Sequence, residues 1–284
     1  MYGENLRMDA ASGAAPILPF LKWAGGKRWL VTQYPSMFAT NFERYIEPFL
    51  GSAAVFFHLQ PKHALLADIN IDLVNCYDAV KERWQDVSRI LKRHQRMHST
   101  EYYYKERSRK RRSAAERAAQ LIYLNRTCWN GLYRVNLNGE FNVPIGTKSS
   151  VVLRTDDFGA VAKALEGAQL LAQDFETTID SARRGDFIFA DPPYTVKHNY
   201  NGFLKYNESI FSWDDQLRLR DALVRAKSRG VQVLVLNANH KSVRELYNGF
   251  GEFRVLSRTS VLAAASAFRG QTTELAIFTD RCLP

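Results

Sequence analysis

Seven short apolar runs, each rich in β-branched or aromatic residues, recur along the chain, and helical patterns separate several of them. The runs read RYIEPF (44–49), ALLAD (64–68), AQLLAQD (168–174), DFIFAD (186–191), VQVLVLN (231–237), FRVLSRTS (253–260) and ELAIFTD (274–280). Runs of this kind predict β-strands. Because helical patterns at 72–80 and 213–229 alternate with them, we expect a mostly parallel α/β sheet. The loop at 261–273 shows no helical pattern, which favours an antiparallel end to the sheet.

The strand rhythm stops between Lys81 and about Glu166, where charged helical sequence leads into the turn-rich stretch NRTCWNGLYRVNLNGEFNVPIG (125–146). We therefore predict an α/β domain formed by residues 1–80 and 166–284, and an inserted domain at 81–165. The formal net charge is +10, and the 14 Lys or Arg against 5 Asp or Glu between Lys81 and Arg126 hold most of this excess. Such a segment favours a polyanionic partner, although a solvated helix face would have the same composition.

The cysteines and histidines give little sign of a metal site. Cys76, Cys128 and Cys282 are widely spaced and form no CxxC pair, which argues against a disulfide framework and favours a reducing compartment. His94 and His98 have a ligand-like spacing, but on a basic helix we expect them at the surface or near a phosphate. The first residues lack the features of a signal peptide, and no segment reaches the ~18 apolar residues that span a bilayer. We therefore expect a soluble cytoplasmic protein.

A small-residue turn lies between a strand and a helix in YIEPFLGSAAVFFHL (45–59). Gly51 in this turn permits a close backbone approach, and Asp68, at the end of the next strand, can accept hydrogen bonds from ribose hydroxyls. This arrangement is typical of nucleotide sites, although glycine turns also serve packing alone. GxGxxG is absent, which argues against a dinucleotide, and WAGGKRWL (23–30) lacks the pattern of a phosphate loop.

The strand at 186–190 leads directly into DPPY, residues 191–194. The Asp191 carboxylate and the Pro192 carbonyl could accept hydrogen bonds from the two N–H groups of an amine and fix it in place. Pro192 and Pro193 hold the loop without offering competing backbone donors. Tyr194 supplies a flat ring on which a base can stack. The alternative is a strand-ending acid that caps the next turn before a rigid loop.

Several motifs occur in a diagnostic order: FLKWAGGKRWL (20–30), EPFLGSAAVFF (47–57), ADIN (67–70), the 125–146 stretch and DPPY. Together they resemble the DNA adenine methyltransferases of the Dam type, in the D12 class, and the resemblance covers residues 20–278. It implies a Rossmann-like methyltransferase fold, with a seven-stranded mostly parallel sheet, an antiparallel last strand and an inserted, mainly helical DNA-recognition domain. It also implies methyl transfer from S-adenosylmethionine to N6 of adenine in double-stranded GATC, after the base rotates out of the helix.

The resemblance also assigns a catalytic loop and a cofactor site. Asp191, Pro192, Pro193 and Tyr194 would form the catalytic loop. The cofactor would be held by Trp23, Lys27, Phe49, Gly51, Asp68, Asp174 and Phe175. Within this set, Trp23 and Lys27 would close over the cofactor, and Asp174 would accept from its adenine amino group. The resemblance requires no metal.

A third set would contact DNA: Lys22, Trp129, Asn130, Leu132, Arg134, Asn136 and Pro144. Trp129 would wedge beside the space left by the flipped base. Arg134 and Lys22 would each reach a guanine, and Leu132 with Pro144 would touch a thymine methyl.

Three positions depart from the family pattern: Trp129 replaces a tyrosine, Ala53 stands where a second glycine is common, and Lys148 lies where an arginine contacts phosphate. Two other functions stay open, namely the same chemistry on a different adenine-containing site and a non-catalytic DNA-binding relative. A restriction endonuclease is a candidate partner, and a monomer could visit each strand of a palindrome in turn.

Overall fold

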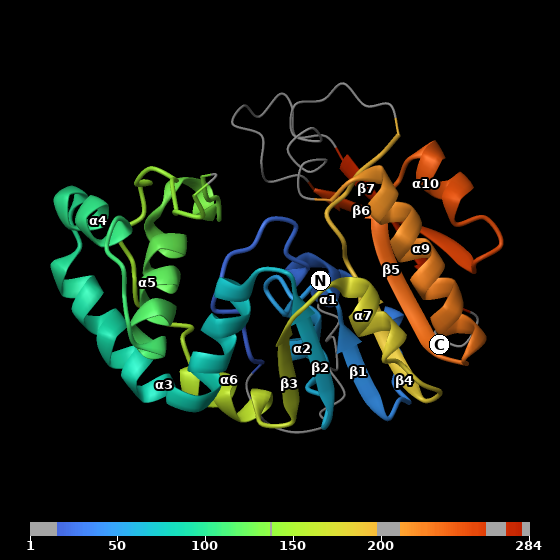
Figure 1. Ribbon diagram of the computed structural model, residues 1–284, viewed down its shortest axis with the longest axis horizontal. Coiled ribbons are helices and arrows are strands. Elements are labelled where there is room, and N and C mark those ends of the chain that lie inside the picture. Colours follow the sequence, from blue (N-terminus) through green and yellow to red (C-terminus); the bar gives the residue numbers. More distant parts are fainter. Residues whose placement is uncertain (1–15, 137, 198–210, 260–270, 280–284) are drawn as a thin grey trace, which may run out of the picture.

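The computed structural model describes residues 16–136, 138–197, 211–259 and 271–279, and its centre is a seven-stranded sheet (Figure 1). The strands are β1 (Arg44–Glu47), β2 (Ala64–Asp68), β3 (Ala168–Ala172), β4 (Asp186–Ala190), β5 (Gln232–Ala238), β6 (Glu252–Thr259) and β7 (Gln271–Phe278). Their order is β3-β2-β1-β4-β5-β7-β6, with β1 to β5 parallel and β7 antiparallel to both β5 and β6. The predicted strands and the antiparallel end are confirmed. Most of the loop predicted at 261–273 lies outside the described residues.

Helices cover both faces of the sheet. They are α1 (Arg28–Gln33), η1 (Pro35–Met37), α2 (Ala54–Leu59), α7 (Phe175–Asp180), α9 (Trp213–Ser228) and α10 (Lys241–Leu246). Successive strand residues point to opposite faces, so Tyr45 packs in one core and Ile46 in the other. α9 begins at a capping box, in which the Ser212 side chain accepts from the Asp215 amide and the Asp215 side chain accepts from the Ser212 amide. The result is a three-layer α/β/α arrangement.

A group of helices lies to one side of the sheet, at the left of Figure 1. It contains α3 (Ile71–Met97), α4 (Thr100–Arg107), α5 (Ala114–Thr127), η2 (Trp129–Gly131) and α6 (Phe158–Leu165). α3 begins at Asn70, whose side chain accepts from two backbone amides of the first turn. The predicted domain boundary after residue 80 lies inside α3, near Arg83, where a φ of −142° kinks the helix. One helix therefore leads from the sheet layers into the helical part, and the two-domain division stays a prediction.

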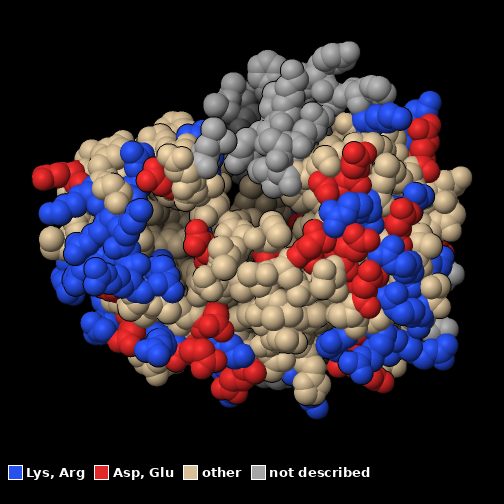
Figure 2. Space-filling view, viewed as in Figure 1, with Lys and Arg blue, Asp and Glu red and all other residues tan. Residues whose placement is uncertain are grey.

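The helical part carries much of the exposed basic charge. Figure 2 shows Lys and Arg side chains gathered over it, and those exposed include Lys92, Arg93, Arg96, Lys105, Arg109, Lys110 and Arg112. Among the described residues, no helix is both long and apolar enough to cross a membrane.

The expected surface position of His94 is wrong. Its ring is buried, stacks on Tyr123 with centroids 4.8 Å apart, and its Nδ1 is hydrogen-bonded to the Tyr102 hydroxyl at 2.7 Å. Burial lowers the pKa of His94 to about 4, so the ring is neutral at pH 7 and serves packing between α3, α4 and α5. Cys76 and Cys128 are buried free thiols, and Cys282 lies outside the described residues.

Candidate active site

The strand order reverses between β1 and β4, where the crossovers diverge toward β2 on one side and β5 on the other. Ligands of α/β sheets bind at the carboxyl ends of the strands at such a point. Asp191 comes directly after β4, the Gly51 turn follows β1, and Asp68 ends β2. The fold therefore brings the DPPY loop and the predicted cofactor turn to the same edge of the sheet.

Lys27 contacts the predicted catalytic acid. Its Nζ lies 2.8 Å from Asp191 Oδ1 and 3.7 Å from Glu274 Oε2, and it donates to the Gly25 carbonyl at 2.6 Å. The side chains of Lys27 and Asp191 are only 4 % and 17 % exposed. Buried charges are costly unless they are paired, and the Lys27 ammonium stabilises the ionised form of Asp191. The resemblance implies that Lys27 closes over the cofactor. In the structure its ammonium is paired with Asp191 of the DPPY loop.

Burial raises the pKa of Asp191 from its ordinary value of 3.8 to about 6, because the carboxylate loses water. The Lys27 ammonium opposes this shift and the Glu274 carboxylate adds to it. Asp191 is therefore ionised at pH 7, as an acceptor must be. Glu47, buried at the end of β1, accepts from the Tyr45 hydroxyl at 3.0 Å, and burial raises its pKa well above the usual range.

The rest of the DPPY loop is anchored at several points. The Tyr194 hydroxyl donates to Glu274 Oε2 at 2.5 Å, and Lys27 Nζ lies 5.1 Å from the centroid of the Tyr194 ring. Pro192 is buried, and the following Thr195 donates through Oγ1 to the Phe211 carbonyl at 2.6 Å. The loop is therefore held by its neighbours as well as by the fixed φ of its two prolines.

The Gly51 turn needs glycine for two reasons. Its φ of +46° is left-handed, and a Cβ at this position would lie 3.0 Å from Cδ1 of Trp23. The Tyr77 hydroxyl donates to the Gly51 carbonyl at 3.1 Å and fixes the turn. Ala53, where a second glycine was expected, also adopts a left-handed conformation, with a φ of +53°. Alanine pays a strain of about 1–2 kcal/mol in this region, which explains why glycine is common there.

Asp68 is bonded to the same turn. Its Oδ2 accepts from the Gly51 amide at 3.2 Å and its Oδ1 from the Asn70 amide at 3.0 Å. Burial raises the pKa of Asp68, and these backbone donors partly offset the shift. The structure thus joins the predicted ribose acceptor to the predicted glycine turn.

Two predicted cofactor aromatics lie against each other. The Phe49 and Phe175 rings are stacked with centroids 5.4 Å apart, and Phe211 packs on both, at 5.7 and 5.5 Å. Phe211 is a member of this cluster that the sequence did not indicate, since its neighbours along the chain belong to the start of α9.

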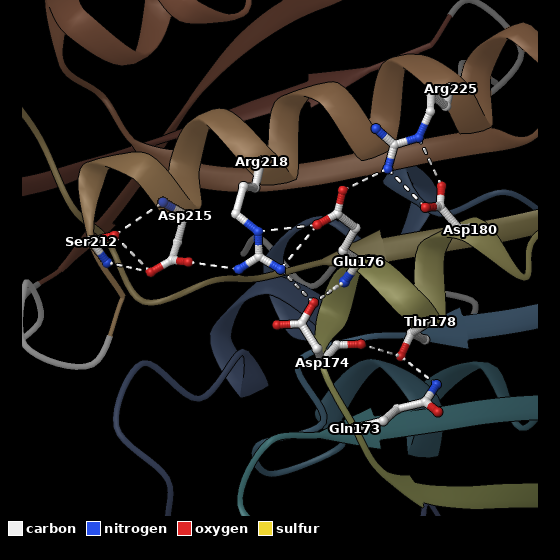
Figure 3. Close-up of polar contacts among 9 residues, drawn as sticks. All are labelled: Gln173, Asp174, Glu176, Thr178, Asp180, Ser212, Asp215, Arg218 and Arg225. Atoms are coloured by element: carbon white, nitrogen blue, oxygen red, sulfur yellow. Dashed lines mark hydrogen bonds and ion pairs between the residues drawn. The ribbon is translucent and has the colours of Figure 1, made fainter.

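Arg218 of α9 holds the predicted adenine acceptor, Asp174. Figure 3 shows its guanidinium reaching from α9 to the first turn of α7. Its Nη2 lies 2.9 Å from Asp174 Oδ1 and 3.0 Å from Glu176 Oε2, and its Nη1 lies 2.9 Å from Asp215 Oδ1. Asp174 Oδ1 also caps α7 by accepting from the Glu176 amide at 2.9 Å. The Arg218 guanidinium lies 4.9 Å from the Phe175 ring centroid, so one side chain touches two predicted cofactor residues.

Most of the predicted DNA contacts lie on an exposed loop and hairpin after α5. Trp129 is 52 % and Leu132 39 % exposed, so both side chains are accessible to a partner. The Trp129 amide donates to the Pro144 carbonyl at 2.9 Å, which joins the two ends of this segment. Exposed residues of the predicted set are Lys22, Trp129, Asn130, Leu132, Arg134 and Pro144.

Arg134 and Asn136 are organised by neighbours in the hairpin. Arg134 Nε donates to Asn142 Oδ1 at 2.7 Å, which orients the guanidinium. Asn136 shapes the turn, because its Oδ1 accepts from the amides of Asn138 and Glu140 at 3.0 and 2.9 Å. The structure gives Asn136 this local role, and its DNA contact stays a prediction.

Lys22 is brought to the hairpin by Asn125, a residue that the sequence did not single out. The buried Asn125 side chain accepts from the Lys22 amide at 2.9 Å and donates to the Lys22 and Gly131 carbonyls at 2.8 and 3.1 Å. Lys148, which lies where the family pattern has an arginine, is a close neighbour of Lys22. The pKa of Lys22 is lowered to about 8, first because the surrounding chain displaces part of the water around its ammonium and then by Lys148. Two neighbouring cations favour an anionic ligand between them.

Arg126, next to Asn125, is also buried, and the motif around it assigns it no contact of its own. Its guanidinium donates to both oxygens of Asp156 at 2.6 Å, to the Val151 carbonyl at 2.6 Å and to the Phe20 carbonyl at 2.9 Å. The signal was present in the sequence, since an NR pair near the end of an apolar helix is unusual unless both side chains are satisfied.

Comparison with known proteins agrees with this geometry. The D12 class N6 adenine-specific DNA methyltransferase family matches residues 23–261. The chain is 35 % identical over 268 residues to the Type II methyltransferase M1.LlaDCHI of Lactococcus lactis subsp. cremoris, covering 91 % of this chain and 94 % of the relative. It is 34 % identical over 250 residues to the DNA adenine methylase of Haemophilus influenzae, covering 86 % and 87 %.

A third relative is similar over most of both chains. The Type II methyltransferase M.MjaIII of Methanocaldococcus jannaschii is 34 % identical over 271 residues, covering 86 % of this chain and 93 % of the relative. Since the match extends over the sheet, the helical part and the DPPY loop, the chain belongs to the D12 class of N6 adenine-specific DNA methyltransferases.

Proposed function

We propose that this enzyme methylates the N6 amine of adenine in double-stranded GATC, with S-adenosylmethionine as donor and with the target base rotated out of the helix. The observation that carries the proposal is the Lys27–Asp191 pair at the switch point of the sheet, with Nζ and Oδ1 2.8 Å apart. It keeps a poorly exposed carboxylate ionised where an amine would have to be held.

The chemistry at the amine follows from the acceptors. The lone pair of an adenine amino nitrogen is delocalised into the ring, so the amine is a weak nucleophile. The Asp191 carboxylate and the Pro192 carbonyl would accept from its two N–H groups and favour sp³-like character at the nitrogen. Tyr194 would stack on the extruded base, which contributes about 1–3 kcal/mol.

The site residues fit S-adenosylmethionine, which would supply an electrophilic methyl group when bound. Lys27, Asp191 and Glu274 together place one ammonium among two carboxylates, so these three side chains carry a net negative charge that suits a sulfonium cation. Gly51 and Asp68 would hold the methionine and ribose parts, and the Phe49–Phe175 pair with Asp174 would hold the adenine. Each group occupies the edge of the sheet where α/β folds bind nucleotides.

DNA recognition is proposed for the exposed hairpin. Trp129 would fill the space left by the rotated base, and Arg134 would donate to O6 and N7 of a guanine. Lys22 and Lys148 would contact the duplex beside it, where the chain concentrates positive charge. Relatives named both DNA adenine methylase and Type II methyltransferase occur, so pairing with a restriction endonuclease is a separate question for the host genome.

The proposal is tested by mapping methylation at single-base resolution. Purified protein is incubated with S-adenosylmethionine and unmethylated DNA, and we expect N6-methyladenine at GATC and at no other sequence at comparable rate. Calorimetry with S-adenosylmethionine tests the cofactor separately. Methylation confined to another adenine context would contradict GATC while keeping the chemistry, and cofactor binding without methylation of any DNA would contradict the enzymatic assignment itself.

Replacing Arg134 tests how the sequence is read. Arg134→Ala should cost about 1–3 kcal/mol at its guanine and relax specificity at that position, because a bidentate base contact is lost. The measurement compares kcat/KM on GATC and on duplexes with one guanine changed. Arg184 is an exposed arginine at the opposite edge of the sheet, so Arg184→Ala is the matched control. It should change neither kcat/KM on GATC nor the preference for GATC over the altered duplexes. An equal loss on every duplex would identify Arg134 as a phosphate contact.

The methylation rate should fall below about pH 6. Only ionised Asp191 can accept from the amine, and its pKa is about 6, so the single-turnover rate should drop about tenfold per pH unit at lower pH. The stability effect has the opposite sign. Since the folded pKa lies above the ordinary 3.8, the contribution of this group to stability is full below 3.8 and is lost as pH rises through about 6. A rate that is flat from about pH 5 to about pH 8 would contradict the role of Asp191.

A further inference from the structure

Glu274 reaches the site from a strand that carries none of the predicted residues. It lies on β7, where it pairs with Ala238 of β5 and Leu256 of β6. Its side chain is 3 % exposed, and a carboxylate so deeply buried lowers stability unless its partners compensate for the lost water. No sequence pattern singled it out, because an acid at the start of an apolar run is an ordinary strand boundary.

The described partners of Glu274 are two residues of the proposed active site. Its Oε2 accepts from the Tyr194 hydroxyl at 2.5 Å and lies 3.7 Å from Lys27 Nζ. Lys27 Nζ in turn lies 2.8 Å from Asp191 Oδ1 and 5.1 Å from the Tyr194 ring centroid. Four side chains from three separate parts of the chain therefore form one connected group.

We propose that Glu274 is a positioning residue for methyl transfer, which fixes the Tyr194 ring through its hydroxyl and shares the Lys27 ammonium with Asp191. This inference rests on the proposed function, in which Tyr194 stacks on the extruded adenine and Asp191 accepts from its amine. Glu274 lies on β7, at the antiparallel end of the sheet. Its carboxylate would set the position of the Tyr194 ring and the distance of the Lys27 ammonium from Asp191.

The geometry explains why a charged acceptor suits this task. A hydroxyl bound to a carboxylate forms a short, strong hydrogen bond, so the hydroxyl end of the Tyr194 ring is held in place before any base arrives. Because Glu274 also attracts Lys27, the ammonium lies between two acids and does not neutralise Asp191 alone. Preorganised groups of this kind cost no reorganisation during the reaction.

Glu274→Gln tests the proposal, because it keeps the shape of the side chain and removes its charge. On DNA that the wild-type enzyme methylates, kcat should fall about 10- to 100-fold, because the Tyr194 hydrogen bond loses its charged acceptor and Lys27 loses one of its two carboxylates. Tyr194→Phe removes the same bond from the other side. If the two residues act together, the double variant should be little worse than either single variant.

The pH profile gives a readout that a purely structural role would not change. The groups that face Asp191 are Lys27, Tyr194 and Glu274, with Glu47 and Tyr45 of β1 behind them. Since Glu274 raises the pKa of Asp191, its neutralisation should shift the acid limb of the rate profile to lower pH. Glu252→Gln, the same change at an exposed position of β6, is the matched control and should leave kcat and the limb unchanged.

The outcomes separate this inference from the proposed function. Wild-type kcat with an unmoved acid limb in Glu274→Gln, or additive losses in the double variant, would overturn the positioning role while leaving wild-type methylation intact. Failure of the wild-type enzyme to methylate would concern the proposed function instead. If Glu274→Gln does not fold by circular dichroism, Tyr194→Phe still decides, because unchanged kcat in that variant also overturns the proposal.

Discussion

The Asp191→Asn variant should methylate DNA about 10²- to 10³-fold more slowly than the wild type, the cost of removing one preorganised electrostatic group from a buried site. Asparagine has nearly the same shape, but its NH₂ group is a donor where the amine of the substrate needs an acceptor. The pairing with Lys27, 2.8 Å away, would also weaken because the amide carries no charge. Single-turnover methylation with saturating cofactor and duplex measures the effect on the chemical step. Asp191→Ala should abolish transfer.

Binding measurements separate this effect from misfolding. DNA affinity, measured by fluorescence anisotropy, should change little in Asp191→Asn, because the proposed DNA contacts lie on the hairpin after α5 and at Lys22. Asp214→Asn, the same change at an exposed position of α9, is the matched control and should keep wild-type rates. A rate within tenfold of the wild type in Asp191→Asn would remove the carboxylate from the mechanism.

Sequence patterns predicted the strands of the sheet and the exposed loop, because these features depend on the periodicity of nearby residues. The run DFIFA is buried at every position in β4, as a central parallel strand must be, and its end marks where the acid lies. The exposure of Trp129 and Arg134 was likewise implied by a turn-rich segment with no apolar periodicity. In both cases the information lies within a few residues of the feature.

Pairings across the chain could not be predicted in this way. Glu274 and Lys27 are separated by most of the chain, and nothing in their neighbouring residues indicates that they meet beside the DPPY loop. His94 was misplaced for the same reason, because a polar residue on a charged helix has the same pattern whether it faces water or Tyr123. Tertiary burial of polar groups is decided by partners that are distant in sequence.

The pairing of Arg126 with Asp156, thirty residues further along the chain, should contribute strongly to the stability of the fold. Arg126→Met should destabilise the protein by about 3–5 kcal/mol, because Asp156 is left as an uncompensated buried charge. The carbonyls of Phe20 and Val151 lose their donors as well. Urea denaturation followed by circular dichroism measures the free energy of unfolding. Arg117→Met, an exposed arginine on the same helix, should stay within about 0.5 kcal/mol of the wild type.

A second substitution distinguishes charge from packing. If Arg126→Met lowers the free energy of unfolding because the Asp156 carboxylate is left unpaired, adding Asp156→Asn should restore part of that free energy. A packing defect would not be relieved by this second change. Arg126 also joins α5 to the segment that carries Lys22, since it binds the carbonyl of Phe20. DNA affinity should therefore fall in Arg126→Met even where the protein remains folded, although no DNA contact is assigned to this residue. A loss of stability below about 1 kcal/mol would show that the guanidinium is not the link that holds these segments together.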